Sequence, residues 1–340
     1  MEIDGSRGEG GGQMLRMAVA LSALTKRSVK IENIRAKRSN PGLAAQHLTA
    51  VRGVARLCSA IVKGDSVGST TLEFEPGQVK GGSFHLDVGT AGSVTLVLQS
   101  CMLASLHADG PVSLRVLGGT NVQWSPPVDY FSNVLLPLLL RMGVHAELRL
   151  VQRGFYPQGG GEVDLALSPP KRILALDEVE RGHLIGVNGV CFSRNLPDHV
   201  CSRMSAAVRK RFLSTPPSIA SDVGKGRSSG AGVQLWSTFE RTILGADALG
   251  ERGLPAEKVG ENAADALFAE IASRGTLDVH ASDQLLPYMA LAETPSGFIV
   301  REVSGHLATQ MELLREFLPV GFKISEVEGG HLVHVEPSHT

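Results

Sequence analysis

One pattern of helices and strands recurs along the chain about every 75 to 80 residues, and it constrains the fold more than any other feature. The spacing of the apolar residues predicts units of helix, strand, helix and two strands. The first unit has helices at residues 13–24 and 42–62 and strands at 28–34, 71–75 and 83–88. The second has helices at 91–106 and 128–142 and strands at 112–117, 145–151 and 162–167. The third has helices at 282–291 and 306–318 and strands at 298–303, 322–328 and 331–335. Three such repeats predict a layered α/β (α+β) fold in which a pair of helices covers each sheet.

A different segment interrupts this pattern between the second and third units. It is predicted to contain helices at residues 199–212 and 255–274 and strands at 184–192, 218–223, 233–239 and 242–249. Pro169-Pro170 and Gly182 precede it, and Gly275 follows it, as expected of connecting turns. We therefore expect a main, catalytic domain of residues 1–180 plus 276–340 and a smaller inserted α/β domain of residues 181–275.

The composition excludes several classes of protein. With 340 residues, 43% hydrophobic and 20% charged, the chain is globular rather than disordered. The net charge of −1 excludes a general polycation, so any contact with nucleic acid would need a local basic patch. Such a patch, or else a solvated charged face, is formed by Lys26, Arg27, Lys30, Arg35, Lys37 and Arg38.

Cysteine usage and hydropathy indicate the compartment. The four cysteines have no metal-binding spacing, and three lie in apolar surroundings as buried thiols do. The sequence has no signal peptide and no apolar run of membrane-spanning length. We expect a cytoplasmic protein with no membrane contact.

A glycine-rich segment, DGSRGEGGGQ at residues 4–13, directly precedes an apolar helical run at 14–24. Glycines before a helix expose backbone N–H groups and the positive helix end, which suit a phosphate. Glu9 would repel that phosphate unless Mg²⁺ or Mn²⁺ lies between them. The segment matches neither a Walker A loop nor the dinucleotide-binding fingerprint. It predicts a metal-bridged nucleotide phosphate, with a purely structural turn as the alternative.

One histidine, His306, lies at a predicted helix start. Leu307, Met311, Leu314 and Leu318 form an apolar stripe on that helix, and His306 lies beside it. A helix N-terminus disfavours imidazolium, so the ring would be neutral and could act as a nucleophile. The alternative is an ordinary capping or surface histidine. A lysine nucleophile is excluded at the start of the chain, because Glu2 occupies the lysine position of a K-x-D-G motif.

Seven motifs in order make the chain resemble the RNA 3′-terminal phosphate cyclases over essentially its whole length. They are DGSRGEGGGQ at 4–13, IRAKRSNPGL at 34–43, QHLTAV at 46–51, GTAGS at 89–93, GFYPQGGG at 154–161, SDQLLP at 282–287 and GHLATQ at 305–310. The resemblance implies three α/β units like those of enolpyruvyl transferases, plus an inserted domain. It also implies ATP-dependent conversion of an RNA 3′-phosphate to a 2′,3′-cyclic phosphate, releasing AMP and pyrophosphate.

The resemblance further implies roles for individual residues. His306 would carry AMP covalently, and Glu9 would hold Mg²⁺ or Mn²⁺. Arg16, Arg35, Arg38 and Gln46 would hold phosphates, with Arg35, Arg38 and Gln46 assigned to the substrate phosphate. The ATP-binding residues would be Gln13, Arg16, Gln99, Pro126, His280, Asp283 and Gln284. The chain departs from the usual family pattern at two positions, with Gln310 in place of asparagine and His280 in place of tyrosine. RNA 3′-phosphate ends and ATP would be the partners, and the sequence leaves open a homodimer.

Two other functions remain as alternatives. One is the non-catalytic branch of the family, which acts in ribosome assembly. The presence of His306, Glu9 and Arg38 argues against it, because a scaffold needs none of them. The other, an enolpyruvyl transferase, rests on the repeat architecture alone.

Overall fold

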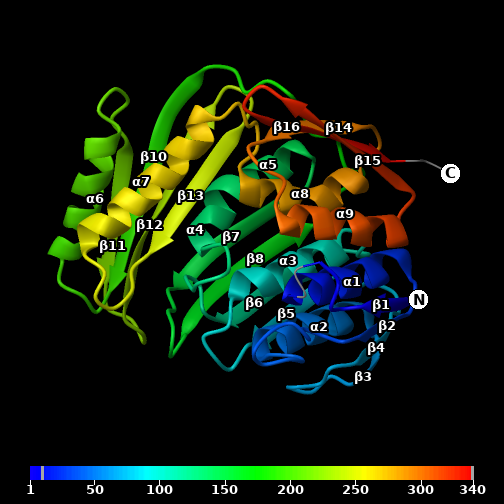
Figure 1. Cartoon of the computed structure of the whole chain (residues 1–340). Helices are drawn as coiled ribbons and strands as arrows, with labels where there is room; N and C mark the ends of the chain where they lie inside the picture. Colours follow the sequence, from blue (N-terminus) through cyan, green and yellow to red (C-terminus); the bar gives the residue numbers. More distant parts are fainter. Residues whose placement is uncertain (9–10, 338–340) are drawn as a thin grey trace.

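The structure is a computed structural model that describes residues 1–8 and 11–337, and these residues form four four-stranded sheets with helices packed on them (Figure 1). The first sheet has the strand order β1-β2-β4-β3. Its unit runs β1 (Glu2–Asp4), α1 (Gly12–Thr25), β2 (Val29–Glu32), α2 (Ala45–Cys58), β3 (Ile61–Lys63) and β4 (Leu72–Glu75).

The second and third units repeat this arrangement. The second runs β5 (Gly82–Asp87), α3 (Val94–Ser105), β6 (Val112–Gly118), α4 (Val128–Tyr130), η1 (Phe131–Leu135), α5 (Leu136–Arg141), β7 (His145–Gln152) and β8 (Gly161–Ser168). The third runs β9 (Asp177–Glu178), α8 (Val279–Ala290), β14 (Ser296–Val300), α9 (Gly305–Phe317), β15 (Val320–Val327) and β16 (Gly330–Pro337). In all three sheets the strands lie in the order first, second, fourth, third, with only the first pair parallel.

The structure corrects the predicted composition of the repeat, because each unit begins with an additional strand. Strands β1, β3 and β9 have only two or three residues, too few for an alternating pattern to be recognised. Strand β5, predicted to end the first unit, pairs in parallel with β6 and opens the second. The helix predicted to reach residue 62 ends at Cys58, because Ser59 adopts a left-handed conformation with φ of 51°.

Helices form the interior of this three-unit body and sheets its outside. Every residue of α1 from Met14 to Leu24 is buried, as expected of a helix that is packed on all sides. It contacts α2, α3 and α9. Strands such as β4 and β6 alternate buried and exposed residues, so one face of each sheet packs on the helices. All four cysteines are buried free thiols, one more than the three expected.

The inserted unit, β10 to α7, has its own sheet and hydrophobic core. It comprises β10 (Leu184–Arg194), α6 (His199–Arg211), β11 (Ser218–Gly224), β12 (Gly230–Phe239), β13 (Ile243–Leu249) and α7 (Ala256–Ala272). Helices α6 and α7 pack on this sheet, at the left in Figure 1. Gly245 of β13 approaches the second unit so closely that a Cβ there would lie 2.7 Å from Tyr130 Cε2 and 2.6 Å from Val134 Cγ2. The inserted unit therefore packs directly against α4 and η1.

Within residues 1–8 and 11–337, no helix is both long enough and apolar enough to cross a membrane.

Candidate active site

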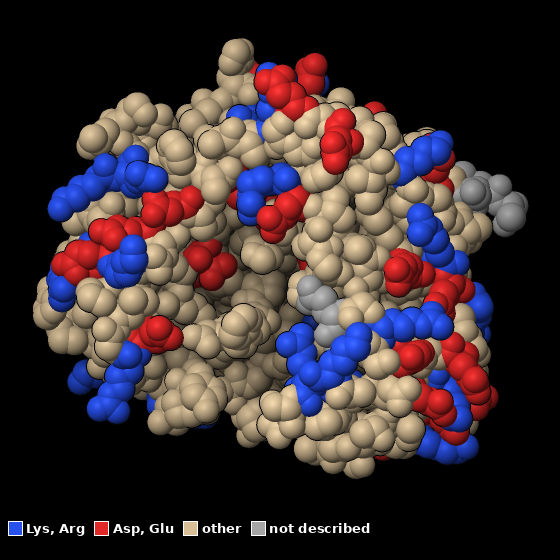
Figure 2. Space-filling model, in the orientation of Figure 1, with Lys and Arg blue, Asp and Glu red and all other residues tan. Residues whose placement is uncertain are grey.

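A cleft of about 1890 Å³ lies where the inserted unit meets the three-unit body. Figure 2 shows a hollow at the centre of this face, with lysine and arginine side chains gathered at its lower right rim. The cleft is lined by all the predicted site residues that the structure describes: Gln13, Arg16, Arg35, Arg38, Gln46, Gln99, Pro126, His280, Asp283, Gln284 and His306. Glu9, the predicted metal ligand, lies outside the described residues. The fold thus brings residues from all three units to one place.

The N-terminus of α1 forms the cationic end of the cleft. Among residues 1–8 and 11–337, no side chain caps this helix start at Gly11, and the first N–H groups of a helix can bind an anion. A Cβ on Gly11 would lie 3.1 Å from Nη2 of Arg38. A Cβ on Gly12 would lie 1.9 Å from Nε2 of His47 and 2.9 Å from Nη1 of Arg16. Only glycine lets these side chains converge on the helix end, which explains the glycine-rich segment physically.

The arginines at this end of the cleft place several positive charges close together, and one of these side chains is buried from solvent. Arg16 is 8% exposed, and burial lowers its pKa to about 10 although Asp283 opposes the shift. Burial and the nearby charge of Arg38 also lower the pKa of Arg35. Arg35 donates from Nη1 to the carbonyl of Gly42 at 2.8 Å, which orients its guanidinium. Like charges held together in this way are stabilised by an anion, and guanidinium groups suit phosphate geometry.

His47 is a polar residue of this end that sequence reasoning did not select. Its Nδ1 accepts a hydrogen bond from the Ala44 N–H at 3.2 Å. Burial, with the charges of Arg16 and Arg35, lowers the pKa of His47 to about 2, so the ring is neutral. Its proton therefore lies on Nε2, which faces Gly12 as an uncharged donor. The signal available in the sequence was its position beside Gln46 in the QHLTAV motif.

Gln46 is oriented in the same way. Its Oε1 accepts from the Ser93 N–H at 2.9 Å, so its NH₂ group remains as the donor at the cleft. His47 thus presents an N–H group at the start of α1, and Gln46 presents its NH₂ group to the cleft.

His306 is held by a chain of amide groups. Nδ1 of His306 lies 2.7 Å from Oε1 of Gln13. Nε2 of Gln13 donates to Oε1 of Gln310, and Nε2 of Gln310 donates to the Asp283 carbonyl at 2.9 Å. A backbone carbonyl can only accept, so each amide orientation follows from the next. Gln13 must present its oxygen to His306, which assigns a proton to Nδ1, so that in the neutral ring the lone pair lies on Nε2.

Gln310, at the position where the family usually has asparagine, links helix α9 to α8 and α1. Its side chain spans from α9 to the Asp283 carbonyl of α8 and also accepts from Gln13, which lies on α1. It therefore orients the histidine through Gln13. The helix start itself is capped by Ser304, whose Oγ accepts from the Leu307 N–H at 3.0 Å.

A second amide chain lies beside the first. Nε2 of Gln99 donates to Oε1 of Gln284 at 2.7 Å, and Nε2 of Gln284 donates to the His280 carbonyl at 2.9 Å. Helix α8 begins there because Asp278 caps it, accepting from the His280 and Ala281 N–H groups. This cap explains why α8 starts at residue 279, three residues earlier than predicted. Pro126 is positioned by its carbonyl, which accepts from Thr95 Oγ1 at 2.7 Å.

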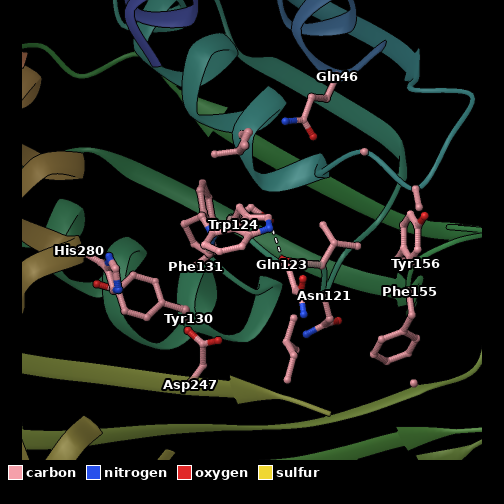
Figure 3. Close-up of a pocket in the computed structure, with 18 of the residues that line it drawn as sticks. Gln46, Asn121, Gln123, Trp124, Tyr130, Phe131, Phe155, Tyr156, Asp247 and His280 are labelled. Carbon is pink, nitrogen blue, oxygen red and sulfur yellow. Dashed lines mark hydrogen bonds between the residues drawn. The ribbon is translucent and has the colours of Figure 1, made fainter. Parts of the chain in front are cut away.

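The inserted unit supplies one wall of the cleft, which the sequence did not reveal. Figure 3 shows Asp247 of β13 below Tyr130 and His280. Burial raises the pKa of Asp247 to about 6, with His280 opposing the shift and Asp278 adding to it. The inserted unit thus places a titratable carboxyl group in the same cleft as His306.

Comparison with known proteins agrees with the motifs. A profile of the family described as RNA 3′-terminal phosphate cyclase matches residues 7–324. The chain belongs to the RNA 3′-terminal phosphate cyclase family. The predicted resemblance is thereby confirmed, and with it the enzyme class, a ligase of RNA processing.

Similar proteins named RNA 3′-terminal phosphate cyclase come from several organisms. That of Methanopyrus kandleri is 48% identical over 338 residues, covering 97% of this chain and 96% of the relative. That of Nitrosospira multiformis is 47% identical, covering 98% and 95%. That of Pyrobaculum aerophilum is 43% identical, covering 99% and 98%. The similarity therefore includes both the three-unit body and the inserted unit.

Proposed function

We propose that the chain uses ATP to convert an RNA 3′-terminal phosphate to a 2′,3′-cyclic phosphodiester through a covalent adenylate on His306. The observation that carries this proposal is the amide chain from Asp283 through Gln310 and Gln13 to His306. In the neutral ring this contact assigns the lone pair to Nε2, and the ring lies in a cleft that also contains Arg16, Arg35 and Arg38. A scaffold would not need a histidine whose tautomer is fixed in this way.

The first step forms an N–P bond and breaks a P–O bond. Nε2 of His306 attacks the α-phosphorus of ATP, and pyrophosphate leaves. The ring gains positive charge, and Nδ1–H remains bonded to Oε1 of Gln13, which stabilises that charge. Arg16 and the neighbouring guanidinium groups offset the negative charge of the phosphates.

Two further steps complete the reaction. An oxygen of the RNA 3′-phosphate attacks the same phosphorus, so AMP passes from His306 to the RNA and the neutral ring is restored. The neighbouring ribose O2′ then attacks the terminal RNA phosphorus, the cyclic ester forms and AMP leaves. The sum is RNA 3′-phosphate plus ATP to cyclic phosphate, AMP and pyrophosphate.

We propose Glu9 as the protein ligand of Mg²⁺ or Mn²⁺. Among the described residues, no three histidine, cysteine, aspartate or glutamate side chains come together as a metal site. A cation held by one carboxylate and by phosphate oxygens and water is the usual mode of Mg²⁺, and Glu9 would supply that carboxylate. When bound, such a cation would neutralise phosphate charge.

We propose that residues 181–275 form a separate domain, inserted into a main domain of residues 1–180 plus 276–340. The support for this division is that β9 and α8 of one unit flank the inserted unit in sequence. A likeness of the three repeated units to those of enolpyruvyl transferases is also proposed, supported by their common strand order.

Incubation with α-labelled ATP tests the function and separates it from the ribosome-assembly alternative. We expect label bound covalently to the protein, and then cyclic phosphate ends when RNA bearing a 3′-phosphate is added. RNA ending in a 3′-hydroxyl is the matched control and should give no product. Absence of both label and product would favour the scaffold.

Arg38→Ala is expected to lower the rate of cyclisation about a hundredfold, and Lys37→Ala to change it little. Both side chains are exposed, but Arg38 lies at the start of α1 and lines the cleft, whereas Lys37 lies outside the cleft lining and donates to the Gly8 carbonyl at 3.2 Å. A guanidinium on a phosphate that gains charge in the transition state contributes about 3 kcal/mol. The measurement is kcat/KM for each variant, and equal losses would contradict the assignment.

Glu9→Gln is expected to raise the concentration of Mg²⁺ or Mn²⁺ needed for adenylation. The substitution keeps the side-chain size and removes the charge that attracts a cation. Adenylate formation is titrated with each metal in the variant and in the wild-type protein. A wild-type metal requirement in Glu9→Gln would assign the carboxylate a structural role.

A further inference from the structure

Two large aromatic side chains stand in solvent on the rim of the cleft. Trp124 is 96% exposed and Tyr156 is 78% exposed, although both line the cleft. Apolar rings are normally covered in a folded protein, so a pair left open beside a binding cleft indicates a ligand. In Figure 3, Tyr156 lies on the opposite side of the drawn cleft from His280, with Trp124 between them. The steps proposed for ATP use neither ring.

The two rings belong to loops that are fixed to each other. Trp124 lies in the loop after β6, and Tyr156 lies between β7 and β8. The Thr120 N–H donates to the Gly154 carbonyl at 2.9 Å, and the Gly154 N–H donates to Thr120 Oγ1 at 3.0 Å. The Asn121 N–H also donates to the Gly154 carbonyl. The rings are therefore carried on one braced frame rather than on two independent loops.

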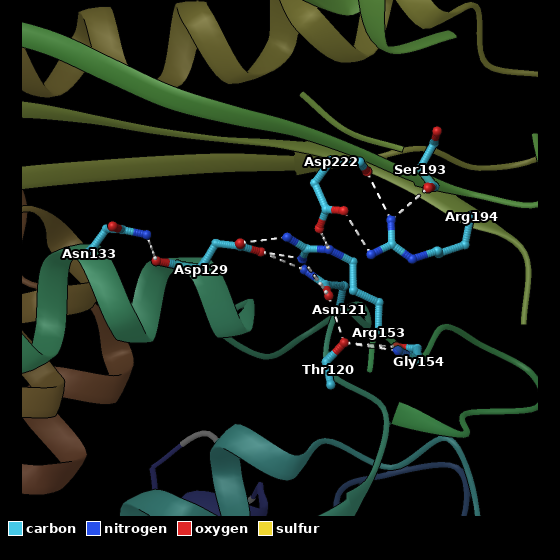
Figure 4. Close-up of polar contacts among 9 residues, drawn as sticks. All are labelled: Thr120, Asn121, Asp129, Asn133, Arg153, Gly154, Ser193, Arg194 and Asp222. Atoms are coloured by element: carbon cyan, nitrogen blue, oxygen red, sulfur yellow. Dashed lines mark hydrogen bonds and ion pairs between the residues drawn. The ribbon is translucent and has the colours of Figure 1, made fainter. Parts of the chain in front are cut away.

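This frame is also fixed to the inserted unit. Arg153, next to the Tyr156 loop, bonds Asn121 and Asp129 of the second unit and Asp222 of β11 (Figure 4). The Phe155 N–H donates to Ser228 Oγ at 2.7 Å, and that hydroxyl donates to the Gly159 carbonyl. These bonds hold the frame that carries the two rings in a fixed position on the inserted unit.

The backbone at Trp124 supports the same conclusion. Its φ of 64° is left-handed, which is uncommon for a bulky residue. The conformation is held by bonds on either side, where Ser125 Oγ donates to the Val122 carbonyl and Thr95 Oγ1 donates to that of Pro126. The indole of Trp124 is thus exposed to solvent by a backbone conformation that other bonds stabilise. Such a conformation indicates that the ring has a function.

We propose that Trp124 and Tyr156 form a stacking platform for the last bases of the RNA 3′ end. The inference rests on the proposed function, because it assigns the RNA part of that substrate. The guanidinium groups of Arg35 and Arg38 hold the terminal phosphate, and the bases behind it stack on the two rings. Stacking is sequence-tolerant because every base has a π-face, so the platform accepts ends of different sequence. Of the residues proposed for the adenylate, His280, Asp283 and Gln284 lie on α8, and Pro126 lies two residues from Trp124, so the platform adjoins the adenylate site.

Binding of RNA bearing a 3′-phosphate to Trp124→Ala and Tyr156→Ala tests the platform. Each variant is expected to weaken binding and raise KM for RNA about tenfold, which is about 1.4 kcal/mol. Trp124→Phe should restore most of the loss, because phenylalanine keeps an aromatic face. Covalent labelling by α-labelled ATP is measured in parallel and should change much less than KM for RNA. Leu213→Ala is the matched control, since Leu213 is 81% exposed and lies outside the cleft lining.

Abasic RNAs show whether the rings contact bases. We expect that removing one of the last three bases weakens binding of the RNA to the wild-type protein. The same removal should cause no further loss of RNA binding in Trp124→Ala or Tyr156→Ala. Additive losses at all three positions, or unchanged RNA binding in both alanine variants, would overturn the platform. A larger effect on labelling than on RNA binding would assign the rings to ATP instead. If the wild-type protein is not labelled and forms no cyclic ends, the proposed function itself fails, and abasic RNA binding still tests the platform.

Discussion

Replacing His306 with alanine is expected to abolish formation of the covalent adenylate and to leave the protein folded. In the neutral ring the proton lies on Nδ1, which contacts Gln13, and Nε2 carries the lone pair that attacks ATP. Alanine offers no nucleophile in its place. The imidazole is only partly buried, whereas the neighbouring Leu307 packs in the core. The loss of labelling should therefore be complete, without a comparable loss of stability. His306→Asn should behave in the same way.

Labelling by α-labelled ATP and thermal unfolding measure the two effects separately. The adduct of the wild-type protein should be labile in acid and stable in base, as a phosphoramidate is, which distinguishes it from an acyl phosphate on a carboxylate. His331→Ala is a matched control, because His331 lies on β16 away from the cleft. Label that persists in His306→Ala would place the nucleophile on another residue.

Replacing Arg153 with leucine is expected to lower the free energy of unfolding by about 3–5 kcal/mol. Arg153 is 2% exposed and bonds both carboxylate oxygens of Asp129 at 2.6 and 2.7 Å. It also bonds Asp222 at 2.7 Å and lies over the Phe192 ring, 4.2 Å from its centroid. Leucine would leave Asp129 buried without a compensating charge, which is the costly outcome for a buried ion pair. Figure 4 shows that these bonds join the second unit to the inserted unit, so the cleft should also lose its shape.

Urea unfolding of the two proteins measures the difference. Arg115→Leu is the control, since Arg115 is 51% exposed in its pair with Asp164 and should lose less than about 1 kcal/mol. A similarly small loss for Arg153→Leu would contradict the prediction.

The ion pair between Arg153 and Asp222 predicts that the stability of the protein depends on pH. Burial acts to raise the pKa of Asp222, but hydrogen bonds and charges from Arg153 and Arg194 outweigh it and hold that pKa below its usual value. The ionised carboxylate therefore stabilises the fold at neutral pH, and this contribution disappears as the pH falls through the lowered pKa. Part of the acid sensitivity of the wild-type protein should be absent in Arg153→Leu.

Local chemistry made several features predictable from the sequence alone. Helix α1 is apolar from Met14 to Leu24 apart from Arg16 and Ser22, so the burial of most of it follows from its composition. The start of α9 follows from Ser304 as a cap and from the apolar spacing behind His306. The seven motifs identified the family, because each is a short run of neighbouring residues.

Tertiary structure alone decided how those motifs act together. The tautomer of His306 depends on Gln13, which is 293 residues away along the chain, and on Gln310 and the Asp283 carbonyl. No local periodicity encodes such a contact, since it exists only after α1, α8 and α9 have packed. The sequence also predicted an inserted unit, but its place as a wall of the cleft depends on Arg153 reaching Asp222 across the interface. The residue types of the site were thus determined by sequence, and the proton positions and the cleft by packing between distant segments.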